Sequence, residues 1–342
     1  MKTANAPLRH KYLAALFVFE CVFLLALAEA VIAWTGLDMR LLGELLYYQC
    51  ADVELHRASG NAVLHYEMKP GASAVFAGGR KVAVNSLGFR DPPRAAAKPA
   101  GVQRIVCLGS SNTYGALVDN GQTYPARLER LLNGPGPGRY EVWNAGVSAY
   151  TLPQNVAAAR EVLAKYSPDL LLFQFNNCGR RPFLAGQPVK AYFDRDPELY
   201  FENLRFCWPR GLAFLRHWRL FRALVFAVNR LSLPAEYSFL NMTGDGYDWS
   251  KCSALRAGDN RLFREFYEEN RGKVRMAVVV APGGAADAEI AALGLPVIEL
   301  SKRLPPGHAA EFDRIHPPAY VYGWYAGEIL KSLTHYGLLP VR

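Results

Sequence analysis

Two short segments of the sequence carry side chains that together can activate a nucleophile. The segment GSSNTYG at residues 109–115 contains two adjacent serines, and the segment DRIH at residues 313–316 places a carboxylate three residues before an imidazole. A serine hydroxyl becomes a strong nucleophile when a neighbouring base takes its proton, and a third group must fix the tautomer of that base. The order Ser, Asp, His fits a hydrolase, so we predict a catalytic triad of Ser111, Asp313 and His316.

The elements around these segments follow an alternating pattern of strands and helices. Strand patterns occur at RIVCLG (104–109), EVWN (141–144), DLLLFQF (169–175), VRMAVVVAP (274–282) and LPVIEL (295–300), and helical patterns at 123–133, 155–166 and 320–336. This alternation predicts an α/β fold, a doubly wound parallel sheet with helices on both faces in a three-layer sandwich. Ligands of such sheets bind beyond the carboxyl ends of the strands, which is where Ser111 falls.

The motifs resemble those of the SGNH (GDSL-like) hydrolases. The first block of that family, in many members Gly-Gly-Ser-x-Thr-x-Gly, is similar to residues 109–115, and its last block, Asp-x-x-His-Pro, is similar to residues 313–317. The segment NAGVS at 144–148 looks like the second block, and the turn at 85–91 resembles one found in membrane-anchored members. The likeness covers about residues 82 to 337. It implies an acyl-serine intermediate and no cofactor or metal.

The resemblance also implies an oxyanion hole. It assigns the donors to the backbone N–H groups of Ser111 and Gly146 and to an asparagine side chain after the next strand. Here the sequence departs from the family pattern Gly-x-Asn-Asp, because that strand ends in QFNN at 174–177. An ungapped match makes Asn176 the donor, and a shift of one residue makes it Asn177; we favour Asn176. Removing one such donor costs roughly 3 kcal/mol of transition-state stabilisation.

The amino-terminal segment from Tyr12 to Trp34 is apolar and long enough to cross a membrane as a helix, which takes roughly 20 residues. Glu20 and Glu29 interrupt it at a cost of about 3 kcal/mol each near mid-bilayer, which the surrounding apolar residues offset. We predict a membrane anchor. A cleaved signal peptide with a processing site at 26–28 is the competing interpretation.

The charges before this segment predict its orientation. Lys2, Arg9 and Lys11 all precede the span, so the positive-inside rule keeps the amino terminus in the cytoplasm. The remainder of the chain is then extracytoplasmic, on the periplasmic or outer side.

We divide the chain into a cytoplasmic tip and anchor (1–34), a juxtamembrane and linker region (35–100) and a catalytic domain (101–342) with an insertion at about 178–273. Within the insertion, residues 211–231 form a basic amphipathic pattern. Such a helix can lie on a membrane surface, cover an active site as a lid, or pack into the core, and the pattern favours the core.

The charge and the cysteine content of the sequence limit the classes of partner that the protein can bind. The net charge is +9, yet the arginines are scattered and accompany no nucleic-acid-binding signature, so we expect no nucleic acid partner. Six cysteines include no Cys-x-x-Cys pair or zinc spacing, so we expect no metal. The expected partners are the membrane, through the amino-terminal helix, and a small-molecule or glycan acyl ester.

These features predict a serine esterase or acyltransferase, whose substrates are ester-linked acyl groups of cell-envelope polysaccharide or glycolipid. His316 acts as general base and then general acid, and Asp313 orients it. The altered third block motivates an alternative: a binding or assembly protein of the cell envelope on a hydrolase scaffold that has lost its activity.

Overall fold

The chain forms two compact units in the computed structural model. The larger consists of Gln49–Pro188 and Thr243–Arg342, and the smaller of Met1–Tyr48 and Val189–Met242. The structure describes residues 6–45, 53–136, 138–175, 194, 210–232, 253–281, 286–300, 304–305 and 316–340. Asp313, Asn176 and Asn177 lie outside the described residues.

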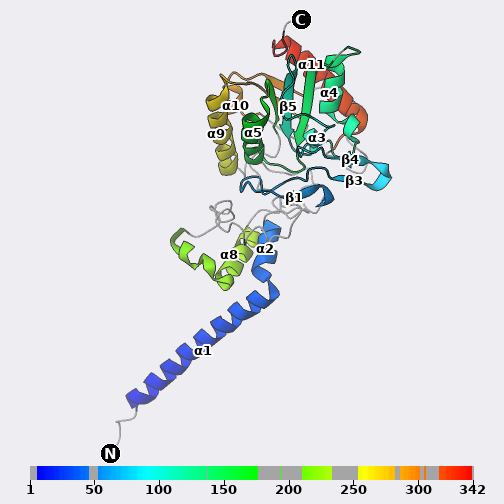
Figure 1. The fold of residues 1–342 in the computed structure, drawn as a ribbon. Coiled ribbons are helices and arrows are strands. Elements are labelled where there is room, and N and C mark those ends of the chain that lie inside the picture. Colours follow the sequence, from blue (N-terminus) through cyan, green and yellow to red (C-terminus); the bar gives the residue numbers. More distant parts are fainter. Residues whose placement is uncertain are drawn as a thin grey trace, which may run out of the picture. The chain divides into compact units, whose positions relative to one another are not determined.

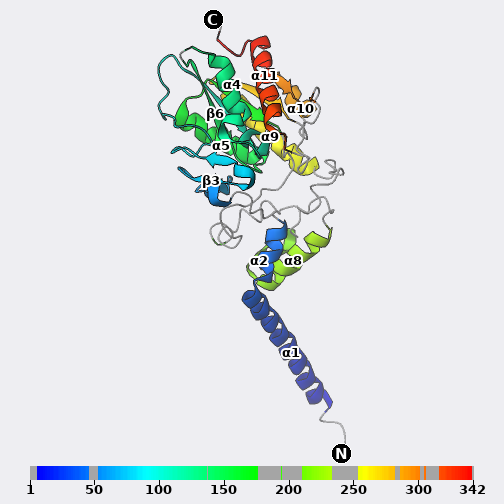
Figure 2. The same ribbon diagram turned by 90° about the vertical axis from the view of Figure 1, so that its right-hand side faces the viewer.

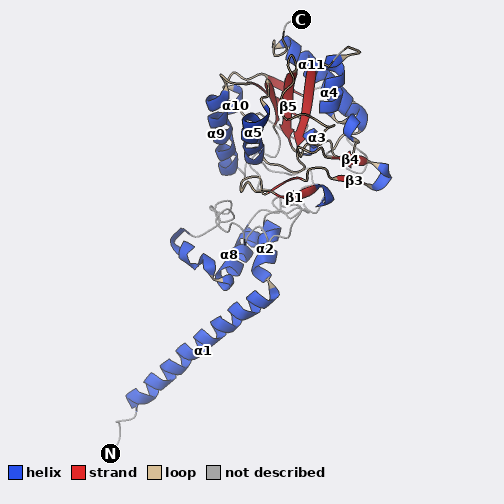
Figure 3. Cartoon of the chain, in the orientation of Figure 1, coloured by secondary structure: helices blue, strands red, loops and turns tan. Residues whose placement is uncertain are grey.

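The larger unit contains a five-stranded parallel sheet, in agreement with the predicted fold class (Figure 3). Its strands are β5 (Gln103–Gly109), β6 (Tyr140–Gly146), β7 (Leu170–Gln174), β8 (Arg275–Val280) and β9 (Val297–Glu299). Their order across the sheet is β6-β5-β7-β8-β9. The connections therefore run in opposite directions on either side of β5, and the carboxyl ends of β5 and β7 flank the point where ligands of such folds bind.

Helices cover both faces of this sheet (Figures 1 and 2). They are α4 (Tyr124–Asn133), α5 (Leu152–Tyr166), α9 (Ser253–Asn270), α10 (Ala288–Ala291) and α11 (Ala319–His335). The single turn α3 (Ser111–Tyr114) directly follows β5, and a 3₁₀ helix η3 (Asn120–Gln122) precedes α4. Local sequence sets where two of them begin. Thr123 caps α4 by accepting the Ala126 N–H, and Thr151 and Gln154 form a capping box at the start of α5.

Two buried clusters hold the sandwich together. Strand residues alternate between them, so that Leu171 and Phe173 pack with α5 and α9, whereas Leu170 and Leu172 pack with α4 and α11. Strands buried on both faces explain the nearly continuous apolar runs in the sequence. Helix α9 lies inside the range predicted as an insertion, yet its Phe263 and Phe266 are fully buried against Phe173.

Two antiparallel hairpins precede the sheet. They pair β1 (His56–Ala58) with β2 (Tyr66–Met68), and β3 (Ser73–Val75) with β4 (Lys81–Ala83), and are accompanied by the 3₁₀ helices η1 (Val53–Leu55) and η2 (Ala77–Gly79). The Tyr66 hydroxyl donates to the carbonyl of Ser148 at 2.6 Å, and the Asn120 side chain donates to Ala83 at 2.7 Å. Part of the region predicted as a linker is therefore ordered against the loops that follow β5 and β6.

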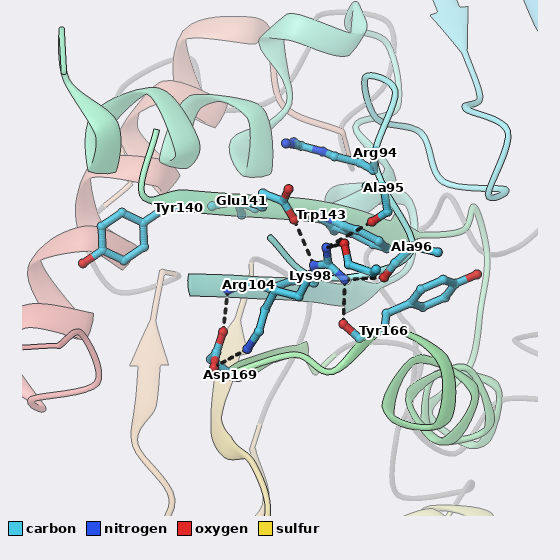
Figure 4. A network of polar contacts seen from close by, with 12 residues as sticks. Arg94, Ala95, Ala96, Lys98, Arg104, Tyr140, Glu141, Trp143, Tyr166 and Asp169 are labelled. Carbon is cyan, nitrogen blue, oxygen red and sulfur yellow. Dashed lines mark hydrogen bonds and ion pairs between the residues drawn. The ribbon is translucent and has the colours of Figure 1, made fainter. Parts of the chain in front are cut away.

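A buried arginine ties the segment after these hairpins to the start of β5 (Figure 4). The Arg104 guanidinium donates to Glu141 at 2.9 Å and to the carbonyls of Ala96 and Tyr166 at 2.9 and 2.6 Å. It also lies over the Trp143 ring, 4.2 Å from its centroid. This network fixes the end of the sheet opposite to the one that carries Ser111.

The smaller unit is helical in its described part. It contains α1 (Ala6–Thr35), α2 (Leu37–Leu45), a 3₁₀ helix η5 (Arg210–His217) and α8 (Arg219–Ser232). Gly36 separates α1 from α2 with a φ of 63°, a conformation that glycine adopts without strain. Residues His10–Thr35 of α1 are long and apolar enough to cross a membrane, and most of their large apolar side chains are exposed.

Candidate active site

Ser111 lies at the carboxyl end of β5, as predicted. The strand ends at Gly109, Ser110 precedes the first turn of α3, and Ser111 opens that turn. Ser110 is fully buried, whereas Ser111 is partly exposed. Of the two adjacent serines, only Ser111 can therefore meet a substrate.

A chain of side-chain hydrogen bonds holds α3 against the next strand. The Thr113 hydroxyl donates to Gln174 Oε1 at 2.5 Å, and the Tyr124 hydroxyl lies 3.1 Å from Thr113 Oγ1. Because Thr113 donates to Gln174, Tyr124 donates to Thr113. Burial raises the pKa of Tyr124 well above its ordinary value, which keeps the phenol protonated as a donor.

Gln174 is the residue that replaces the glycine of the third family block, and the structure gives it a defined contact. It occupies the last position of β7, buried, with its side chain directed at Thr113. Its Nε2 is buried and finds no hydrogen-bond partner among the residues that the structure describes. Gly109 makes room for both side chains, since a Cβ there would lie 2.2 Å from Thr113 Oγ1 and 2.7 Å from Gln174 Cβ.

Gly146 permits a close approach between the second block and the first. A Cβ at this position would lie 2.3 Å from the Tyr114 nitrogen and 2.6 Å from the Thr113 carbonyl carbon. Its backbone N–H donates to Asn144 Oδ1 at 3.0 Å, and the Asn144 amide donates to the Tyr114 carbonyl at 3.3 Å. An oxyanion role for Gly146 therefore requires its bond to Asn144 to break.

The turn after β6 contains a strained residue that the sequence did not single out. Ala149 has a φ of 65°, in the left-handed region that favours glycine. It lies three residues beyond Gly146 and is partly exposed. Strained backbone conformations of this kind are found mainly at functional sites. The sequence does not predict the conformation of Ala149, because alanine is not a residue typical of turns.

Arg90 is a second residue that sequence reasoning missed. Its buried guanidinium donates to the carbonyls of Tyr114 and Gly115 at 2.8 and 2.6 Å and to that of Val118, and it lies 4.5 Å from the centroid of the Tyr114 ring. It therefore satisfies the carbonyls that α3 leaves unpaired at its end. The turn at 85–91 positions Arg90. Asn85 Oδ1 stabilises this turn by accepting hydrogen bonds from the N–H groups of Leu87 and Phe89 at 3.0 Å each.

His316 lies three residues before α11 and is partly buried. Helix α11 approaches the nucleophile loop, since the Tyr322 hydroxyl donates to the Ala116 carbonyl at 3.4 Å. The structure therefore brings α11, the helix that follows His316, to the loop that follows Ser111. Asp313 and the two candidate asparagines fall outside the described residues, so their roles stay predictions.

A cavity of about 190 Å³ opens beside the carboxyl end of β6. Its wall includes residues of both hairpin 56–68 and helix α5, with Gly146 and Tyr150 among them. Charged side chains around it are paired: Arg57 with Glu67 at 2.6 Å, and Lys165 with Glu161 at 2.9 Å.

The fold and this site define a doubly wound α/β sandwich with a partly exposed serine at the switch point of its sheet. No protein-family model matches the sequence, and a comparison with curated proteins finds no match.

Among solved structures the chain is similar to esterases and to a lipolytic protein. One is the psychrotrophic esterase EstA from Pseudoalteromonas sp. (9% identity, TM-score 0.40, covering 69% of this chain and 100% of that one). Another is the acetylxylan esterase Axe2 from Geobacillus stearothermophilus (14%, 0.37, 69% and 96%). A third, from Desulfitobacterium hafniense, is assigned to the lipolytic G-D-S-L family that the motifs resemble (12%, 0.37, 68% and 99%).

Proposed function

We propose that this protein is a serine esterase or O-acyltransferase of the SGNH type, anchored in a membrane by α1. The observation that carries the proposal is the placement of Ser111. It is partly exposed at the carboxyl end of β5, next to the switch point, and both neighbouring strands hold its turn in place. Thr113, Gln174 and Arg90 all hold the turn that contains Ser111. A serine with only a structural role in a turn would not require such support.

The proposed reaction has two steps. His316 Nε2 takes the Ser111 proton as Ser111 Oγ bonds to the carbonyl carbon of the ester, and the tetrahedral intermediate collapses when the leaving alcohol receives that proton. The acyl-serine is then attacked by water or by an acceptor hydroxyl, whose proton passes to His316 and back to Ser111. Asp313 fixes the imidazole tautomer. Hydrolysis and transfer differ only in the acceptor.

The oxyanion that forms in each step needs preorganised donors. We propose the backbone N–H of Ser111, that of Gly146 once released from Asn144, and the side chain of Asn176 or Asn177. The Ala149 N–H, in the strained turn after β6, is an additional candidate because its positive φ departs from ordinary loop geometry.

Fluorophosphonate labelling tests the nucleophile. The wild-type protein should label, and Ser111→Ala should lose the label. Ser110→Gly should keep it, because Ser110 is buried and many members of the family that the motif resembles carry glycine there. A wild-type protein that is folded but does not label would contradict the enzyme proposal.

The second candidate is a binding or assembly protein on this scaffold. Two observations favour a protein without esterase activity. The Gly146 N–H already donates to Asn144, and Gln174 occupies the position of the glycine in the family pattern. It predicts no labelling at Ser111 together with intact folding, so the same experiment separates the two functions.

The proposed location is the extracytoplasmic face of a membrane, which makes acylated polysaccharide or glycolipid the substrate class. The support is the apolar length of α1 and the basic residues before it. A phosphatase fused to the carboxyl terminus should be active, and a cytoplasmic readout from that fusion would overturn the topology.

A further inference from the structure

Helix α8 has an exposed apolar stripe. Leu224, Val228 and Leu231 are 56%, 62% and 87% exposed. Their spacing of four and three residues places them on one side of the helix. Phe214 and Trp218, just before α8, are also exposed. Apolar side chains gathered on one surface in this way mark a site of interaction.

The opposite side of α8 is already occupied within the smaller unit. Ala223, Val225 and Phe226 are buried, and α8 contacts α1 and α2. The Arg222 guanidinium donates to the buried Asp38 carboxylate, with Nη2 and Oδ2 2.6 Å apart. The stripe is therefore a second apolar face, and it takes no part in the packing of α8 against the residues that the structure describes.

Glu29 fixes the start of α8 near the end of α1. Its carboxylate accepts the backbone N–H groups of Arg219 and Leu220 at 2.9 and 2.7 Å. A carboxylate at a helix amino terminus satisfies orphan donors and complements the helix dipole. This contact also explains why the apolar stretch of α1 tolerates Glu29 near its end.

The position of Glu29 places this contact within about 5 Å of the boundary between hydrocarbon and headgroups. Glu29 lies six residues before Thr35, which is roughly 9 Å along a helix. The 26 residues of His10–Thr35 extend about 39 Å, whereas the hydrocarbon core is about 30 Å thick. Centred on that core, the helix projects about 5 Å beyond it at each end, so its last turn reaches the interface. Trp34, 88% exposed in that turn, is a residue type enriched there.

The charges of η5 and α8 suit an anionic surface. Apart from Arg222, which pairs with the buried Asp38, residues 210–232 contain four arginines and one histidine and no aspartate or glutamate. Interfacial helices combine such a basic composition with an apolar face.

We propose that η5 and α8 lie on the surface of the membrane that α1 crosses, with Leu224, Val228 and Leu231 in contact with anionic phospholipid. This inference rests on the anchor in the proposed function and goes beyond it, because it gives the protein a second lipid contact. The same face then holds the smaller unit at a fixed depth.

Photo-crosslinking to lipid tests the inference on the full chain. The protein is reconstituted in vesicles of phosphatidylcholine and phosphatidylglycerol that contain a phospholipid with a photoactivatable acyl chain, and adducts are mapped by peptide mass spectrometry. We expect adducts in residues 210–232 within about threefold of those in α1. The variant Leu224→Gln/Val228→Gln/Leu231→Gln should lose about fivefold or more of the adducts in 210–232 and keep those in α1.

Two controls accompany this variant. The single change Leu231→Gln, at the most exposed position of the stripe, should lower the adducts without disturbing the buried face of α8. Val75→Gln, at an exposed apolar position of the larger unit, should leave them unchanged.

The outcomes separate the inference from the proposed function. Adducts in α1 with none in 210–232 would overturn the surface contact and leave the anchor standing. Adducts in 210–232 that the triple variant retains would overturn the role of the stripe. An α1 without adducts would overturn the anchor, and the surface contact with it.

Discussion

We expect Thr113 and Gln174 to position the turn of Ser111 jointly, through the hydrogen bond between their side chains. Gln174→Met replaces the amide with an apolar side chain of similar length, and Thr113→Val removes the hydroxyl from the other side. We expect each change to lower kcat for a simple aryl ester about tenfold with little effect on KM, because the bond aligns the nucleophile rather than the substrate.

The double variant decides whether the two residues are coupled. If they are, its kcat should fall no further than that of the more impaired single variant. A double variant whose loss equals the product of the two single losses would show that each residue acts separately.

The substitution Gly146→Ala tests the close approach between the two motif loops. A Cβ there meets backbone atoms of Thr113 and Tyr114, which have no side-chain freedom to yield. We expect a loss of about 3 kcal/mol in the free energy of unfolding, measured by denaturant titration. Gly121→Ala is the matched control, since a Cβ at Gly121 meets nothing within 4 Å. Equal stabilities of the two variants would contradict this packing.

At the scale of elements, Arg104 joins three parts of the larger unit: the segment before β5, the neighbouring strand β6 and the end of α5. Its guanidinium is fully buried, so removing it takes the ion-pair partner from Glu141 and this donor from the carbonyls of Ala95, Ala96, Ala97 and Tyr166. We expect Arg104→Ala to lower the free energy of unfolding by about 3 to 5 kcal/mol.

A surface pair provides the comparison for this buried one. Arg57 pairs with Glu67 but its side chain is 52% exposed, so Arg57→Ala should cost less than about 1 kcal/mol. Thermal or denaturant unfolding of the two variants measures the difference. A similar cost for both would mean that burial of Arg104 adds nothing to its network.

The elements also show what the sequence could and could not predict. The parallel sheet followed from apolar runs separated by helical patterns, because burial on both faces leaves a strong compositional signal. Helix α9 falls in the range predicted as an insertion, because that range has no regular pattern and is rich in aromatic residues and arginine. The same composition hides the aromatic residues Phe263 and Phe266, which enter the core. The role of Arg90 could not be predicted from the sequence, because most of its hydrogen-bond acceptors are backbone carbonyls, which every residue type has.

At the scale of the whole molecule, Asp91 links stability to pH. Burial raises the pKa of its carboxyl from 3.8 to about 7, and the neighbouring Arg94 offsets this only in part. The folded protein therefore keeps this proton up to about pH 7, whereas the unfolded chain releases it near pH 4. The stability that Asp91 contributes is complete below the lower value and is lost as pH rises through the higher one.

Comparison with Asp91→Asn isolates this contribution. Between about pH 5 and about pH 8, the free energy of unfolding should fall more in the wild type than in the variant, which has no proton to release. Denaturant titrations at both pH values measure it. Parallel pH profiles for the two proteins would show that Asp91 titrates at its ordinary value.

The claim that unites these scales is an acyl group carried by Ser111. Rapid quenching of the wild-type protein with p-nitrophenyl acetate, followed by peptide mass spectrometry, should find one acetyl group on the peptide that contains Ser111, and Ser111→Ala should carry none. Turnover of the ester with no acetylated peptide, or an acetyl group retained elsewhere in Ser111→Ala at the wild-type level, would contradict the account.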